Sequence, residues 1–135
     1  MKTINYVVIA AVVLLVIVLS SLTSRKEKGP PAYNAAAETT VSGVVQETKE
    51  FSCPISEDQG THLVLRTNQG DLLIHVAPAR FLRAQEFRFN PNDQVSVVGT
   101  LVNYQGQDAM LAREITRGNE VLIVRDHQGL PLWKK

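Results

Sequence analysis

Residues 61–76 read THLVLRTNQGDLLIHV and predict the central hairpin of an all-β domain. Two runs of alternating residues flank the turn sequence TNQG at 67–70, a pattern typical of antiparallel strands joined by a short loop. Pairing across this four-residue connection sets His62 opposite His75 on one face, while the other face carries Leu63, Leu65, Leu72 and Ile74. The stretch therefore predicts both a local structure and a pair of neighbouring imidazoles.

Short β-rich runs continue on both sides of this hairpin, and turn residues separate them. Gly43 lies inside the first run, where glycine permits the bend that a closing barrel requires. Residues 50–60 are expected to form a loop. The predicted strands are residues 39–48, 61–67, 71–76, 94–104, 109–116 and 120–125, and residues 79–87 are the helical candidate between the third and fourth strands.

Two segments, VSGVV at 41–45 and NDQVSVVGTL at 92–101, resemble those of bacterial OB-fold proteins. The OB fold is a five-stranded, partly open Greek-key barrel. The resemblance covers residues 39–116 and is nearest to the small secreted or periplasmic bacterial OB-fold proteins. It implies a barrel domain over residues 39–135 that works at the cell envelope, in connection with envelope stress and small cationic or polyanionic ligands.

The N-terminal residues 1–24 predict a membrane anchor or a signal segment, because residues 4–22 carry no charge. A bilayer span needs about 20 apolar residues and a signal-peptide core about 7–15, and the purest apolar run, 7–19, falls in the shorter range. An uncleaved anchor and a cleaved signal both remain open. The basic residues Arg25, Lys26 and Lys28 after the segment favour a cytoplasmic domain by the positive-inside rule, by a small margin. A short basic start followed directly by an apolar core is how secretory signals begin, so we expect the domain on the periplasmic side or secreted, behind a flexible, exposed linker at 25–38.

Composition narrows the class of function. Fourteen Lys and Arg residues against thirteen Asp and Glu residues give a formal charge of +1, which is not the field of a polyanion-binding protein. The lone Cys53 forms no internal disulfide. No nucleophile elbow, phosphate-cradling glycine loop or helix-borne zinc motif is present in the sequence, so we expect a binding protein and not an enzyme.

The opposed histidines suggest a metal site. Directly opposed residues of a hairpin have Cβ atoms about 5 Å apart, so His62 and His75 could share one ion. Cys53 lies on the segment that enters the same hairpin, which makes a copper or zinc site of Cys53, His62 and His75 conceivable. The alternative is two rim histidines and a loop cysteine without metal, since the sequence has no CxxC or HxxxH spacing and a register slip of one residue would separate the imidazoles.

A basic and aromatic cluster follows the hairpin. OB domains bind single-stranded nucleic acids by stacking bases on aromatic rings along a basic groove, and this cluster is the one part of the sequence that fits such a role. The alternative is that the phenylalanines cap the core and the arginines are solvated, and an exported location argues against nucleic acid. The cluster consists of Arg80, Arg83 and Arg88 with Phe81, Phe87 and Phe89.

Two residues near the C-terminus have alternative interpretations. Trp133 either packs on the barrel as a plug or, with the arginines, anchors a partner. His127 lies roughly where haem chaperones of cytochrome maturation carry a haem-attaching histidine, but its RDHQG context lacks the histidine-acid-acid sequence of that family. The sequence thus favours an anchored or exported module that contacts a protein or a small ligand, with metal or haem handling as the alternative and single-stranded nucleic-acid binding as the second alternative.

Overall fold

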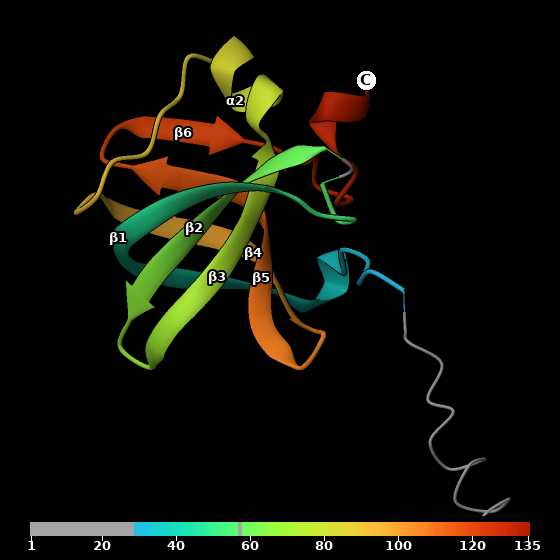
Figure 1. Ribbon diagram of the computed structural model, residues 1–135, viewed down its shortest axis with the longest axis horizontal. Helices are drawn as coiled ribbons and strands as arrows, with labels where there is room; N and C mark the ends of the chain where they lie inside the picture. Colours follow the sequence, from blue (N-terminus) through green and yellow to red (C-terminus); the bar gives the residue numbers. More distant parts are fainter. Residues whose placement is uncertain (1–28, 57) are drawn as a thin grey trace, which may run out of the picture.

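The computed structural model describes residues 29–56 and 58–135, which form a β-barrel with one short α-helix at one end (Figure 1). None of the helices in this part of the chain has the length and apolar character needed to cross a bilayer. The predicted anchor at 1–24 lies outside the described residues. The elements are η1 (Ala35–Ala37), β1 (Glu38–Ser52), β2 (Gln59–Thr67), β3 (Gly70–Pro78), α2 (Ala79–Ala84), β4 (Gln94–Tyr104), β5 (Gln107–Arg117), β6 (Glu120–Ile123) and η2 (Leu132–Lys134).

The strand connections close a barrel of the OB type. The hydrogen-bonded order is β3-β2-β1-β4-β5-β6, and a short parallel pairing of β3 with β5 closes the ring. All the other pairings are antiparallel, and α2 follows β3 directly before the chain crosses to β4. This is the Greek-key arrangement of the OB fold. The predicted five strands and interposed helix are therefore confirmed, and β6 is the additional C-terminal strand.

Strand β1 is longer than predicted and pairs with two neighbouring strands. Its first half pairs with β4 and its second half, up to Ser52, pairs with β2. The strand bends near Gly43, where an added Cβ would collide with the carbonyl oxygen of Arg66. The expectation of a loop over residues 50–60 was therefore wrong at both ends, because pairing between Phe51 and Gly60 extends both strands and leaves only residues 53–58 as the connection.

The β2–β3 hairpin has the predicted register. His62 pairs with His75 across it, as Arg66 does with Asp71, and the register shifts only beyond His62. The barrel interior receives the opposite face of the hairpin, where Leu63, Leu65 and Ile74 have no exposed surface. The core of the barrel is completed by Val45, Val97, Met110, Ala112 and Ile115.

Two predicted boundaries differ from the structure. The helix ends at Ala84 and not at residue 87, because Glu86 adopts a φ of 53° that an α-helix does not allow. The predicted linker at 25–38 is attached to the barrel before it ends: Asn34 is hydrogen-bonded with Thr100, and the hydroxyl of Tyr33 donates to Glu38. These contacts tie the entry of β1 to β4.

Candidate metal centre

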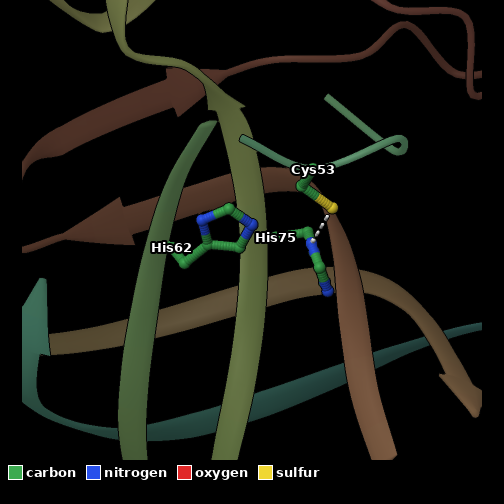
Figure 2. A group of neighbouring side chains, drawn as sticks. All are labelled: Cys53, His62 and His75. Carbon is green, nitrogen blue, oxygen red and sulfur yellow. Dashed lines mark hydrogen bonds between the residues drawn. The ribbon is translucent and has the colours of Figure 1, made fainter. Parts of the chain in front are cut away.

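The structure brings Cys53, His62 and His75 together at one end of the barrel. One ligand atom from each residue lies within 4.8 Å of the others, and all three side chains are buried. Figure 2 shows the side chains converging from the segment after β1, from β2 and from β3. The Sγ atom of Cys53 lies 3.8 Å from Nδ1 of His75, and the two imidazoles meet edge to face with centroids 4.7 Å apart. The predicted constellation is therefore present as a three-residue cluster.

The orientation of His62 leaves one nitrogen available. Its Nδ1 donates to the carbonyl oxygen of Gly60 at 2.9 Å, which places the proton on that atom. The lone pair then resides on Nε2, which is buried and has no hydrogen-bond partner in the described part of the chain. The ring points toward His75 in Figure 2. A buried acceptor without a partner is unfavourable, so this nitrogen is the atom for which a ligand is most needed.

Burial keeps both imidazoles neutral. Desolvation, followed by the nearby His62 and Arg125, lowers the pKa of His75 from 6.5 to about 4. Desolvation also lowers the pKa of His62. Because metal ions bind the neutral imidazole, both side chains are in their ligand form at neutral pH without loss of a proton.

The spacing fits a copper or zinc ion. Metal–sulfur bonds of about 2.3 Å and metal–nitrogen bonds of about 2.0–2.1 Å place a sulfur and a nitrogen ligand roughly 3.5–3.8 Å apart, and two nitrogen ligands roughly 3.3–3.6 Å apart, in tetrahedral or trigonal sites. The separation of Cys53 Sγ from His75 Nδ1 is already 3.8 Å, and the largest separation in the cluster, within 4.8 Å, needs a movement of about 1 Å. One thiolate and two imidazoles form a donor set that suits Cu(I) and Zn(II).

A stacked aromatic ring and a neighbouring cleft determine the solvent access of the cluster. Phe51 stacks on the His62 ring with centroids 3.7 Å apart and planes 7° from parallel. A cleft of about 370 Å³, lined by Phe51, Cys53 and His75 among others, lies between the β1–β2 connection and the turn of β4–β5 near Tyr104. OB folds bind their ligands between these same two loops. Phe51 therefore covers the ring of His62, while Cys53 and His75 border the cleft.

A larger cleft of about 480 Å³ lies farther along the barrel, between the β2–β3 turn and the β4–β5 hairpin. Its titratable lining residues are Asp71 and Asp108, and neither cysteine nor histidine contributes to it. The larger cleft lacks a thiolate or imidazole ligand, so size alone does not identify the candidate site.

The basic and aromatic cluster is dispersed in the fold. Phe89 is buried, Phe87 packs against it beneath the guanidinium of Arg117, and Phe81 meets Trp133 edge to face. The phenylalanines thus cap the core, as the alternative interpretation held. Arg80, Arg83 and Arg88 remain exposed around α2, with Arg80 paired to Asp58.

The two C-terminal candidates, Trp133 and His127, also lie in different environments. Trp133 is 8% exposed and belongs to the hydrophobic core cluster, so it acts as a plug and does not offer an exposed contact for a partner. His127 lies exposed in the turn that joins Arg125 to Pro131, away from the buried cluster of Cys53, His62 and His75.

Sequence reasoning missed two residues beside the centre. Phe51 fell within a segment interpreted as a loop, although its alternation with Lys49 could have extended the first strand. Arg125 gave no signal, because a single arginine near the end of a chain is normally solvated. It is buried here only because the C-terminal segment folds back over the β2–β3 hairpin.

Comparison with solved structures gives distant likenesses. The first, the S. pombe Stn1-Ten1 complex, has a TM-score of 0.49 and 10% identity, with 68% of this chain and 62% of that chain covered. A Replication Protein A heterotrimer bound to ssDNA has a TM-score of 0.42 and 19% identity, with 67% of this chain and 60% of that chain covered. The chain thus spans about three fifths of the length of these proteins. Among curated proteins the search found no match.

The family comparison is more direct. The match covers residues 37–122 of the 135 in the chain, from the entry of β1 to β6. It includes Cys53, His62 and His75, while Arg125 and Trp133 lie beyond it. The chain belongs to the MamS/MamX magnetosome protein family.

Proposed function

We propose that this OB domain is a metal-binding module of the MamS/MamX magnetosome protein family, and that Cys53, His62 and His75 hold one copper or zinc ion. The observation that supports this most is the convergence of the three buried ligand atoms within 4.8 Å, with Nε2 of His62 unpaired.

The number of ligands favours binding with exchange over a permanent structural role. Structural zinc sites are closed by four protein ligands, whereas sites with three protein ligands keep a position for a further group. The cleft beside Cys53 and His75 leads to the side from which such a group would approach. The proposal is therefore a domain that receives and passes on a metal ion or presents it to a small ligand, with no catalytic step assigned to it.

The setting of this activity is also a proposal. The apolar segment at 1–24 would hold the domain at a membrane, on the extracytoplasmic side, where it would serve as an accessory module that contacts a protein partner. Membership of a magnetosome family is compatible with such a membrane-associated role. Membrane fractionation combined with protease accessibility of the full-length protein tests this setting, and full recovery in the cytosolic fraction would contradict it.

Metal titration of the full-length protein tests the site itself. We expect about one Cu(I) or Zn(II) ion per chain, measured by competition with a chromophoric chelator and by elemental analysis. Cys53→Ser, His62→Gln and His75→Gln should each weaken binding by about 100-fold or more, since even the outer partners of metal ligands contribute 10- to 100-fold.

The matched control is His127→Gln, which removes an exposed histidine from the same chain. This variant should bind like the wild type. Equal binding by all the variants, or binding that falls with His127→Gln, would rule out the centre.

A further inference from the structure

A buried positive charge lies next to the candidate metal centre. Arg125 is 7% exposed, and its Nη1 donates to the carbonyl oxygen of Gly129 at 3.0 Å. The guanidinium carbon lies 5.3 Å from the ring centroid of Tyr33 and 5.0 Å from that of Trp133. Aromatic faces attract a cation but carry no net charge, so these contacts hold the guanidinium without neutralising it.

No carboxylate neutralises Arg125 within residues 29–56 and 58–135, and its Nε atom has no hydrogen-bond partner there. Arg113, in contrast, is similarly buried but donates to both carboxylate oxygens of Glu38. Burial lowers the pKa of Arg125, yet an arginine side chain stays protonated in proteins at neutral pH. A buried charge without a counterion is destabilising, so we infer that Arg125 is buried at this position for a functional role and not for stability.

The charge and the metal ligands share one small space. A cavity of about 10 Å³, the size of a single water molecule, is lined by His62 and His75 on one side and by Arg125 and Trp133 on the other. A metal ion held by these imidazoles would therefore lie close to the guanidinium charge and be repelled by it.

We propose that Arg125 sets the charge preference of the centre, so that the site favours a monovalent soft ion, Cu(I), over a divalent ion such as Zn(II). This inference rests on the proposed metal-binding function and names the charge state of the ion. A thiolate of Cys53 and two neutral imidazoles carry one negative charge together. A monovalent ion gives a neutral centre, whereas a divalent ion leaves one positive charge facing the guanidinium.

The effect is large enough to measure. Two unit charges a few ångströms apart in a protein with an effective dielectric constant of about 20 change an equilibrium by about tenfold or more. The repulsion acts in full on the extra charge of a divalent ion and is absent for a neutral centre. Removal of the guanidinium charge should therefore strengthen Zn(II) binding with little change in Cu(I) binding.

The test measures the ratio of Cu(I) to Zn(II) affinity in the full-length protein by chelator competition, with Cu(I) kept reduced. Arg125→Met should move this ratio toward Zn(II) by about tenfold or more. Arg125→Lys, which keeps the charge, should stay close to the wild type. A packing role alone would weaken both ions together and leave the ratio unchanged.

A second pair of variants tests the charge without removal of Arg125. Ile55 is half-buried and lines the same cavity, so Ile55→Glu introduces a carboxylate beside the guanidinium, and Ile55→Gln adds the same shape without charge. We expect Ile55→Glu to move the ratio of Cu(I) to Zn(II) affinity toward Zn(II) and Ile55→Gln to leave this ratio unchanged. If Arg125→Met does not fold, these two variants still test the effect of the guanidinium charge.

An unchanged ratio in the folded variants, with metal still held by Cys53, His62 and His75, would overturn the role of Arg125 and leave the proposed function standing. Absence of Cu(I) and Zn(II) binding by the wild type would overturn both. A shift of the ratio with Arg125→Met or Ile55→Glu, but not with their controls, supports the inference.

Discussion

The two faces of the β2–β3 hairpin are both buried at the end that carries His62 and His75, but they differ in chemistry. The inner face presents Leu63, Leu65 and Ile74 to the barrel core, where they belong to one cluster of buried apolar side chains. The outer face presents His62 and His75, which are covered by Phe51 and by the C-terminal segment. Burial of leucine is favourable, whereas burial of an imidazole with an unpaired nitrogen is not. The inner face therefore accounts for stability, and the outer face is stabilised only if a ligand satisfies it.

The largest expected difference between the faces is in packing. Leu65→Ala should lower the free energy of unfolding by about 3 kcal/mol, because it removes a fully buried side chain and leaves a cavity. His62→Leu should change it by no more than about 1 kcal/mol, since the lost hydrogen bond to Gly60 is offset by removal of the unpaired Nε2. Urea denaturation of the full-length protein in metal-free buffer measures the change in the free energy of unfolding for both substitutions. An equal loss from the two substitutions would make the outer face a second structural core.

Of the two faces of the hairpin, only the outer one should contribute to the pH dependence of stability. The pKa of His75 is about 4 in the folded state and about 6.5 in the unfolded chain, so between these values the unfolded state binds a proton that the folded state does not. Stability is complete above pH 6.5 and falls as the pH decreases toward 4, by about 3 kcal/mol in total. Denaturation curves across this range, in metal-free buffer, measure the slope.

His75→Gln should reduce that slope, while His127→Gln and Leu65→Ala should keep it. Leu65→Ala would displace the whole curve downward without a change in shape, because the inner face titrates no group. A slope that is the same in wild type and His75→Gln would show that His75 is accessible to protons in the folded state.

The smallest expected effect on the free energy of unfolding comes from Phe51, whose ring covers His62 on the outer face. Phe51→Ala removes a half-exposed ring that stacks on His62, so the free energy of unfolding should fall by only about 1 kcal/mol. Release of bound metal to a chelator should nevertheless become faster, since solvent reaches the His62 side of the centre. Leu101→Ala, at another exposed apolar side chain, is the matched control and should leave the release rate unchanged. Slower or equal release from Phe51→Ala would contradict the shielding role.

Much of the candidate site could be predicted because the hairpin is local. The turn at 67–70 and the alternation on both sides of it place His62 opposite His75 with no information from the rest of the chain. Cys53 was predicted only as a neighbour in sequence, and its approach to His75 depends on how β1 extends past residue 48. The cover provided by Phe51 was missed because residues 50–60 were interpreted as a loop, whereas that provided by Arg125 was not predictable, since it joins segments far apart in the sequence.

By itself the sequence determined the strands, the interposed helix, the hairpin register and the pairing of the two histidines, because periodicity and turn chemistry act over a few residues. The tertiary structure alone decided that the imidazoles are buried and neutral, that Cys53 completes a cluster of three ligands, and that Arg125 is placed beside them without a counterion. These features depend on closure of the barrel by β3 and β5 and on the return of the C-terminal segment. Burial and charge are set by what packs on a face, and local sequence does not specify that.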